Sequence, residues 1–320
     1  MTIVGNVFFI RPNNNNDFTF ENIRKSGYQI DVPYKGNSIF FRIIREIWFR
    51  LNLPFQFLWY NNDVNKTDCN TLIVYDPLIV PEYLVWLRKK NLKKRIVLFY
   101  GNPVNRTINP DLIPDDCCEK WSWDLGDCEN YGMNYVRSGY WEGLKVTKKV
   151  LLYDIVFVGR DKGRAKDLLE LKKIFRKMRL KIKMHIVADR RYQRYFKPFY
   201  GRILKYDEIL GLLSQSRAVL DIVQENQSGL SARAMESLFN EIKLITDNRN
   251  IVKYDFYDKE NVFIIDQDDI ALLPEFLRRP YKKIDHEIVS LYTFENWIKK
   301  ILSTEGTMKK KAQLLRNTKT

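Results

Sequence analysis

Residues 227–238, QSGLSARAMESL, combine a polar loop that contains a glycine with the start of a helical pattern. They follow the apolar run 218–223, which is typical of a buried strand. A doubly wound sheet uses a strand, a glycine-bearing loop and a helix in this order to bind a phosphate or a sugar nucleotide. The stretch therefore predicts a site for an anionic ligand.

A second loop of the same kind lies upstream. The apolar residues 155–158 lead into Gly159 and Gly163, and a helical pattern follows over 165–178. Glycines allow the backbone to approach a phosphate, and Arg160, Lys162 and Arg164 place three cations at a helix amino terminus. A solvated basic turn would show the same composition. Two such loops in one half of the chain predict a single ligand held from two sides.

The spacing of these glycines excludes two common classes of nucleotide enzyme. It does not match the dinucleotide fingerprint, and no Gly-Lys-Ser/Thr triplet of a phosphate-binding loop occurs. The sequence therefore speaks against nicotinamide enzymes and ordinary kinases.

With these two loops the chain resembles bacterial glycosyltransferases of the GT-B architecture that build lipopolysaccharide, capsule and exopolysaccharide. Residues 158–164, 206–210, 227–238 and 243–248 carry the resemblance, together with 121–128 and Tyr131-Gly132 in the first half. It implies an α/β fold of two Rossmann-like domains that face a central cleft. It also implies transfer of a sugar from a nucleotide diphosphate sugar to a hydroxyl of a growing cell-surface glycan.

The resemblance assigns roles to residues of both loops. It places the donor diphosphate near the cations, and it implies that the carboxylate of Glu236 accepts hydrogen bonds from the ribose hydroxyls. An exposed helix carboxylate with Arg233 as its surface partner is the plainer alternative for Glu236. The expected donor-binding residues are Gly159, Arg160, Lys162, Arg164, Gln227, Ser228, Gly229, Leu230, Ser231, Arg233 and Glu236.

The chain departs from many retaining relatives at position 228. They carry a glutamate eight residues before the ribose-binding one, and this chain has Ser228, with the amide of Gln227 beside it. An inverting transfer would need a general base, and the first half contains no histidine. Asp76 and Asp17 are the candidate bases, and helix caps near Pro81 and Phe18 are their alternative roles.

We expect no metal and no cofactor, and the nucleotide sugar would be a substrate. Cationic side chains at the phosphate loop can neutralise the departing diphosphate. Cys69, Cys117, Cys118 and Cys128 lack the paired spacing of a zinc ribbon, so reduced thiols are expected.

The net charge of +15 favours an anionic partner. Residues 39–51 combine large apolar side chains with arginines at helical spacing, which suits either an anionic membrane surface or a core-facing helix whose arginines reach solvent. No membrane span and no signal peptide are recognised, so a cytoplasmic protein, peripheral on the inner leaflet, is expected. The resemblance implies a lipid-linked or lipid A-linked saccharide as acceptor.

Alternating apolar and helical patterns predict a parallel sheet with crossover helices in each half. Strands are expected at 3–10, 56–59, 71–75, 95–100, 154–158, 181–187, 218–222, 243–246 and 262–265, and helices at 39–51, 81–90, 165–178 and 286–302. We expect an acceptor-binding domain over 1–148, a donor-binding domain over 149–284, a helix over 285–305 that packs across both, and a basic tail over 306–320.

Two other classes of function remain open. Tyr192, Tyr195, Phe196, Phe199 and Tyr200 alternate with basic residues, which suits a non-catalytic protein that binds nucleic acid or a membrane surface. The absence of a known nucleic-acid module speaks against nucleic acid as a partner. A sugar-nucleotide epimerase or a polyol phosphate transferase would have the same fold and would catalyse a different reaction.

Overall fold

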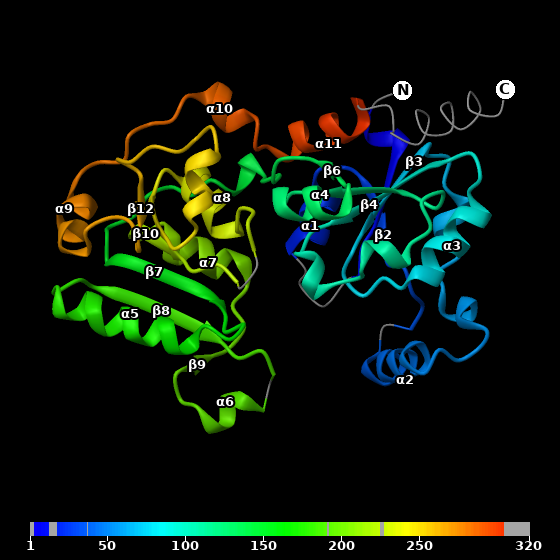
Figure 1. Ribbon diagram of the computed structural model, residues 1–320, viewed down its shortest axis with the longest axis horizontal. Coiled ribbons are helices and arrows are strands. Elements are labelled where there is room, and N and C mark those ends of the chain that lie inside the picture. Colours follow the sequence, from blue (N-terminus) through cyan, green and yellow to red (C-terminus); the bar gives the residue numbers. More distant parts are fainter. Residues whose placement is uncertain (1–2, 13–17, 37, 191, 225–226, 304–320) are drawn as a thin grey trace. The chain divides into compact units, whose positions relative to one another are not determined.

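The computed structural model describes residues 3–12, 18–36, 38–190, 192–224 and 227–303. The chain forms two compact units. Unit 1 is Met1–Val136 with a stretch that begins at Lys300, and unit 2 is Arg137–Lys299 (Figure 1).

Unit 1 contains a six-stranded sheet in the order β2-β1-β3-β4-β5-β6, in which every neighbouring pair is parallel. The first three positions follow the order 2-1-3 of flavodoxin-like sheets. The chain therefore adds β2 on one side of β1 and β3 on the other side. The strands are β1 (Val7–Ile10), β2 (Gln29–Asp31), β3 (Thr71–Tyr75), β4 (Arg95–Tyr100), β5 (Glu119–Ser122) and β6 (Asn134–Tyr135).

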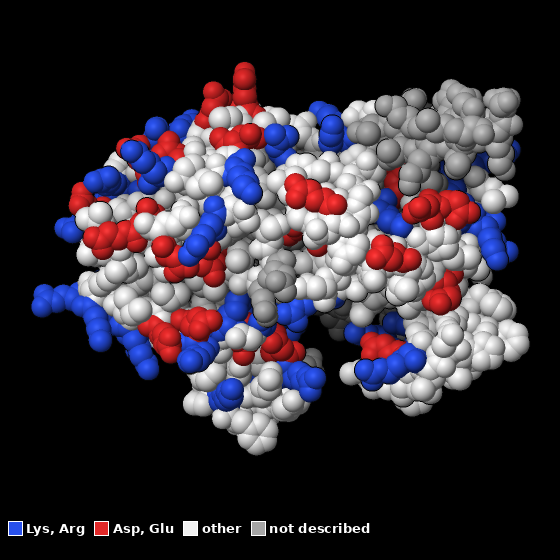
Figure 2. All heavy atoms as spheres, viewed as in Figure 1, with Lys and Arg blue, Asp and Glu red and all other residues white. Residues whose placement is uncertain are grey.

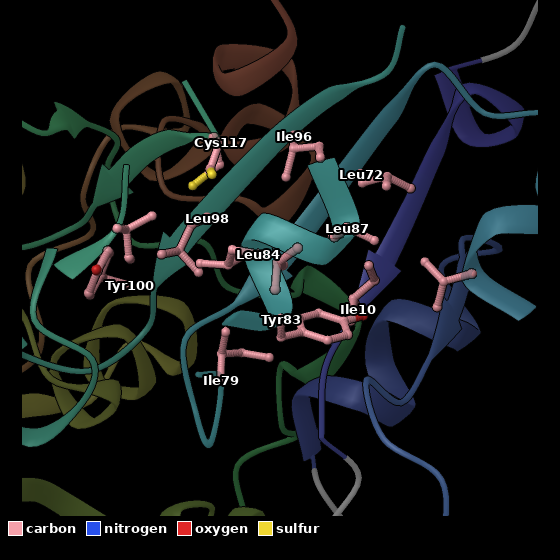
Figure 3. Packing of buried hydrophobic residues seen from close by; sticks show 14 of the residues in the cluster. Ile10, Leu72, Ile79, Tyr83, Leu84, Leu87, Ile96, Leu98, Tyr100 and Cys117 are labelled. Carbon is pink, nitrogen blue, oxygen red and sulfur yellow. The ribbon is translucent and has the colours of Figure 1, made fainter. Parts of the chain in front are cut away.

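The core of unit 1 lies between this sheet and α3 (Pro81–Lys90). All five residues of β3 are buried, as expected for a parallel strand covered on both faces. Leu84 and Leu87 of α3 pack against Leu72 and Leu98 of the sheet (Figure 3). The other helices of unit 1 are α1 (Phe18–Lys25), α2 (Ile39–Arg50) and α4 (Leu125–Tyr131), with short 3-10 turns at Ile3–Asn6, Gln56–Trp59, Asp63–Lys66, Val104–Arg106 and Pro110–Leu112.

Unit 2 contains a second parallel six-stranded sheet, in the order β12-β11-β10-β7-β8-β9. Read from β9, this is the order 3-2-1-4-5-6 of the Rossmann fold. The strands are β7 (Tyr153–Arg160), β8 (Ile182–Val187), β9 (Tyr200–Gly201), β10 (Ser216–Asp221), β11 (Lys243–Thr246) and β12 (Val262–Ile264).

Helices cover the second sheet and connect its strands. They are α5 (Ala165–Lys177), α6 (Gln193–Phe196), α7 (Tyr206–Leu213), α8 (Ala232–Asn240), α9 (Leu273–Arg278), α10 (His286–Ser290) and α11 (Phe294–Ser303), with 3-10 turns at Glu142–Leu144, Arg249–Lys253 and Ile270–Leu272. The chain passes from unit 2 into unit 1 within α11.

Two parallel sheets with crossover helices confirm the expected fold class of two Rossmann-like domains. Three local predictions were wrong in part or in full. The strand expected over 3–10 begins only at Val7, since Ile3–Asn6 form a 3-10 turn. Residues 56–59 form a 3-10 turn instead of a strand, because Phe55 enters it with a left-handed φ of 61°. The single helix expected over 286–302 is interrupted after α10, where Leu291 caps the helix and Tyr140 accepts a hydrogen bond from the Phe294 amide.

Among the described residues, no helix has the length and the apolar character that crossing a bilayer requires.

A buried ion pair anchors the end of α11 to the sheet of unit 1. Arg95 on β4 donates from Nε and Nη2 to the two carboxylate oxygens of Glu119 on β5, at 2.8 and 2.6 Å. Its Nη1 donates to the carbonyl of Ile301 at 2.8 Å. The Glu119 side chain is 6% exposed, and among the described residues this arginine and the indole N–H of Trp121 compensate its charge.

We expect Glu119→Gln to lower the free energy of unfolding by about 3 kcal/mol, because it leaves Arg95 poorly solvated and without its counter-charge. Urea denaturation of the whole chain, followed by tryptophan fluorescence, measures the loss. Asp63→Asn is the matched control, since its pair with Lys66 is exposed and should contribute little to stability. Equal effects of the two substitutions would contradict the anchoring role.

Candidate functional site

The two loops that the sequence singles out follow β7 and β10, which are neighbours at the centre of the second sheet. The chain runs outward in one direction through β8 and β9 and in the other through β11 and β12. This reversal is a topological switch point, and open α/β sheets bind ligands there, beyond the carboxyl ends of the strands. The loop 161–164 and the described parts of the second loop, 222–224 and 227–231, therefore lie at the position that the fold offers to a ligand.

Asp161 fixes the loop after β7. One oxygen of its buried carboxylate accepts the amide N–H of Ala165 at 2.7 Å, at the start of α5, and the other accepts the hydroxyl of Tyr200. The loop then turns through left-handed backbone at Lys162 (φ 49°) and Gly163 (φ 85°). Asp189 after β8 accepts the Lys162 amide at 2.9 Å. The turn thus has a fixed shape in which the Lys162 side chain is exposed.

Arg164 joins this loop to the one after β10. Its side chain is buried, and Nη1 donates to the carbonyl of Ile222. Nη2 donates to the carbonyl of Arg160 at 2.8 Å, and Nε to that of Asp161 at 3.2 Å. Burial lowers the pKa of the guanidinium to about 10, so it remains charged at neutral pH. Three carbonyl partners make Arg164 a link between the loops, and direct contact with a diphosphate stays a prediction.

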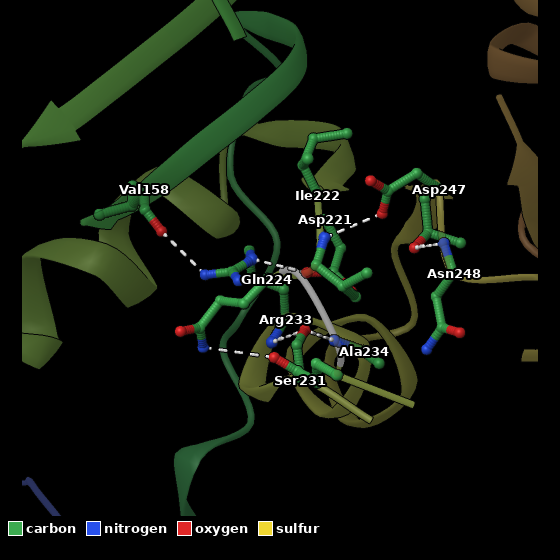
Figure 4. Close-up of polar contacts among 12 residues, drawn as sticks. Val158, Asp221, Ile222, Gln224, Ser231, Arg233, Ala234, Asp247 and Asn248 are labelled. Atoms are coloured by element: carbon green, nitrogen blue, oxygen red, sulfur yellow. Dashed lines mark hydrogen bonds and ion pairs between the residues drawn. The ribbon is translucent and has the colours of Figure 1, made fainter. Parts of the chain in front are cut away.

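Arg233 makes a second link from the first turn of α8 (Figure 4). Its Nε donates to Asp221 at the end of β10 at 2.9 Å, and its Nη1 to the carbonyl of Val158 on β7 at 3.4 Å. A Cβ at position 159 would lie 3.2 Å from Nη1 of Arg233 and 3.1 Å from the ring of Phe157. A side chain at position 159 would therefore be tightly placed, and Arg233 or Phe157 would have to shift by a few tenths of an ångström.

Asp247, directly after β11, holds the start of the loop after β10. Its carboxylate accepts the Val223 amide at 2.8 Å (Figure 4). Burial raises the pKa of Asp247 to about 6; the hydrogen bond from Val223 opposes this shift, and the nearby Asp221 adds to it. A half-buried carboxylate at the switch point could therefore respond to a bound anion.

The loop 227–231 leads into the amino terminus of α8. Ser231 caps the helix, with its hydroxyl accepting the amides of Arg233 and Ala234 at 3.1 and 3.4 Å. The carbonyl of Gly229 accepts the side-chain amides of Gln227 and Asn248, each at 3.3 Å. The helix terminus with its partial positive charge is thus presented at the switch point, where an anion would be stabilised.

Glu236 lies one turn further along α8 and is only 5% exposed. Its Oε1 accepts the hydroxyl of Tyr206 at 3.0 Å, and Tyr206 in turn lies 2.7 Å from the hydroxyl of Tyr140. Burial raises the pKa of Glu236 to about 7, against the opposing effects of Arg233 and of the Tyr206 hydrogen bond. The plainer alternative of an exposed carboxylate paired with Arg233 is excluded, since Arg233 pairs with Asp221.

All eleven predicted donor residues lie in unit 2. Arg160 is exposed, and its Nη1 lies 3.4 Å from the carbonyls of Ala188 and Asp189. The residues collected around the ends of β7 and β10 are Gly159, Arg160, Lys162, Arg164, Gln227, Ser228, Gly229, Leu230, Ser231, Arg233 and Glu236.

The two candidate bases belong to unit 1. Asp76 directly follows β3 and is fully buried: Oδ1 accepts the Gly101 amide at 2.7 Å, and Oδ2 the side-chain amide of Asn102 at 3.2 Å. Burial raises its pKa to about 6. Its side chain does not cap α3, whose N-cap residue is Val80. Asp17 lies outside the described residues.

Several site residues were not identified from the sequence. Asp161, Asp247, Tyr206 and Tyr140 all hold a loop or a side chain of the switch point. Asp161 and Asp247 directly follow strands. The rule that ligands bind beyond the carboxyl ends of parallel strands could have identified them. Tyr140 lies 66 residues from Tyr206, and no local pattern signals such a contact.

No protein-family model matches the chain, and no curated protein matches it. Solved structures do resemble it over most of its length. A lipopolysaccharide outer core galactosyltransferase, WaaB in its apo form, is 12% identical over 92% of this chain and 97% of its own, with a TM-score of 0.45. MurG of Acinetobacter baumannii is 9% identical over 92% and 97%, with a TM-score of 0.41.

A Listeria monocytogenes protein described as a UDP-N-acetylglucosamine 2-epimerase is 9% identical over 95% of this chain and 96% of its own, with a TM-score of 0.41. At this distance the likenesses transfer no activity and no residue role. The roles of the residues in this chain are therefore inferred from the geometry of the site.

The raised pKa of Glu236 predicts a pH dependence of stability. A carboxyl whose pKa is higher in the folded than in the unfolded chain stabilises the fold below pH 4.5, and this contribution is lost as the pH rises through about 7. Glu236→Gln removes the titration and keeps the shape. We therefore expect the melting temperature of wild type, relative to that of Glu236→Gln, to fall by several degrees between pH 5 and pH 8.

The comparison with the variant cancels the titrations of Asp76 and Asp247, which fall in the same range. Glu170→Gln on the exposed side of α5 is the control and should follow wild type at both pH values. A constant difference between wild type and Glu236→Gln would show that Glu236 is ionised throughout.

Proposed function

We propose that the protein is a glycosyltransferase of the GT-B type that transfers a sugar from a nucleotide diphosphate sugar to a hydroxyl of a cell-surface glycan. The observation that carries the proposal is Glu236, a buried carboxylate one turn inside the helix that begins at the Rossmann switch point of unit 2. A buried carboxylate with an accessory hydroxyl donor suits neutral, polyhydroxylated ligands such as ribose.

The donor diphosphate would bind at the amino terminus of α8. The helix dipole favours an anion there, and the exposed cations Arg160 and Lys162 on the facing loop add positive charge. Arg164 and Arg233 stabilise the two loops instead, because Asp221 and backbone carbonyls take their N–H groups. Backbone amides and hydroxyls of 228–231 would meet the phosphates or the sugar.

Tyr206 would orient Glu236 for this contact. When the carboxylate is ionised it can only accept hydrogen bonds, so Tyr206 must donate to Oε1 and Tyr140 must donate to Tyr206. Among the described residues, Oε2 has no hydrogen-bond partner, so the ribose hydroxyls would bind on that side. Binding of the ribose would favour the ionised carboxylate and lower its pKa below about 7.

No metal or cofactor is required by this proposal, since the cations and the helix terminus can neutralise the departing diphosphate. The acceptor we propose is a lipid-linked or lipid A-linked saccharide at the cytoplasmic side of a membrane. The resemblance of the sequence to lipopolysaccharide and capsule glycosyltransferases supports this class of acceptor.

Donor binding is tested by the thermal shift of the full chain with UDP, GDP, CDP, ADP and dTDP in turn. We expect one of these to raise the melting temperature of wild type and of the control Glu170→Gln. Glu236→Gln should weaken binding of that nucleotide by about 1 to 3 kcal/mol. If no diphosphate shifts the melting temperature and a single-stranded oligonucleotide does, the exposed aromatic residues Tyr195 and Phe196 become the binding surface instead.

The proposal that Asp76 is the general base has a separate test. If Asp76 is the base, Asp76→Asn should lose most of its turnover with little loss of donor affinity, because proton transfer is lost. The melting temperature should fall in either case, since an asparagine must place its NH₂ group against the Gly101 amide or the Asn102 side-chain amide. Full turnover with a lowered melting temperature would show that Asp76 only holds the loop after β4.

A further inference from the structure

Unit 1 exposes an apolar surface that its own core does not use. Nine large apolar side chains within residues 39–58 are exposed, although they lie next to the well-packed cluster of unit 1. We call this the α2 face; its members are Ile39, Phe40, Phe41, Ile43, Ile47, Leu51, Phe55, Phe57 and Leu58. In soluble proteins, a contiguous surface of this kind marks an interaction site.

The orientation of α2 contradicts one of its two expected roles, that of a core-facing helix whose arginines reach solvent. Arg45 points inward: it is 7% exposed, donates from Nη1 to the carbonyl of Lys35 at 3.1 Å, and lies over the ring of Tyr34 at 4.8 Å. Phe49 packs beside it, with its ring 5.2 Å from that of Tyr34. Because Arg45 and Phe49 anchor the helix, Ile39, Ile43 and Ile47 on the other side point to solvent.

Helical spacing places the exposed residues in one stripe. At 100° per residue, Ile39, Ile43, Ile47 and Leu51 fall within an arc of about 120°. The 3-10 turn after the helix extends the stripe with Phe55, whose bulky side chain is held in left-handed backbone at φ 61°. Such a conformation is uncommon for a large residue. Trp48 fixes the turn to the helix, because its indole N–H donates to the carbonyl of Pro54 at 2.9 Å.

Positive charge flanks the stripe. Arg42 is half-buried at its margin, Arg50 is exposed within its arc at the last turn of the helix, and Lys35 is exposed just before the helix, whereas Glu46 is the single acidic residue within 35–58. Figure 2 shows the surface of the same region as mostly uncharged, with few charged side chains at its edge. An apolar stripe with a cationic margin complements an anionic bilayer, in which acyl chains lie beneath negative headgroups.

We propose that the α2 face is a membrane-binding surface, on which α2 lies parallel to an anionic bilayer with its apolar stripe among the headgroups and upper acyl chains. A helix of 12 residues is about 18 Å long, too short to span a hydrocarbon core of about 30 Å. This proposal rests on the proposed reaction at a membrane-bound acceptor. Its test measures vesicle binding without any nucleotide, so a failure of donor binding in unit 2 would not contradict it.

The test is co-sedimentation of the full chain with extruded vesicles of phosphatidylethanolamine with about a third phosphatidylglycerol, and with phosphatidylcholine vesicles as the neutral comparison. We expect binding to the anionic vesicles that weakens as salt rises. The triple variant Ile39→Ser, Ile43→Ser, Ile47→Ser should lose about tenfold or more of its apparent affinity, because three side chains no longer leave water. These positions are exposed, so the fold should persist, and circular dichroism checks it.

The matched control is Leu92→Ser with Leu112→Ser, which removes two exposed apolar side chains of the same unit away from α2 and should bind as wild type does. Arg42→Gln with Arg50→Gln should weaken binding to anionic vesicles and leave binding to neutral ones unchanged. Three results would overturn the proposal: no binding by wild type, equal binding by the triple variant, or a wild-type dimer that the triple variant dissociates in analytical ultracentrifugation, which would make the face a contact between copies.

Discussion

Two arginines hold the candidate donor site together. Arg164 reaches from the loop after β7 to the carbonyl of Ile222 after β10, and Arg233 reaches from α8 to Asp221 on β10 and to Val158 on β7. Loops at a switch point diverge, so few backbone hydrogen bonds can join them. The buried guanidinium groups supply those links, and the positions of Gly159, of the start of α8 and of Glu236 all depend on them.

These links also determine the charge of the site. Arg164 and Arg233 are balanced locally by Asp221 and Asp247. Arg160 and Lys162, by contrast, are exposed cations at the loop after β7. Under the proposed function, the phosphates would bind near the exposed positive charge and the ribose would bind at the buried carboxyl of Glu236.

The sequence predicted the parts of this site that local chemistry determines. Glycine and cation patterns after apolar runs located both loops, and the strands β3 and β4 were found because buried parallel strands are almost continuously apolar. Contacts between distant residues were not predictable in this way. Tyr140, Tyr206 and Glu236 meet only in the folded chain, and β2, β6 and β9 are too short to leave a pattern. For α2, periodicity defined an apolar face but could not show that Tyr34 draws Arg45 inward and leaves that face in water.

The central claim is that Glu236 binds the ribose of a nucleoside diphosphate, and a thermodynamic cycle tests it most directly. Calorimetry would measure the affinities of wild type and Glu236→Gln for the ribonucleoside diphosphate that the protein binds and for its 2′,3′-dideoxy analogue. Direct contact predicts a coupling energy of about 1 to 2 kcal/mol, since the substitution matters only when the hydroxyls are present. Additive effects, with a coupling near zero, would contradict the claim and leave Glu236 as a structural residue of α8.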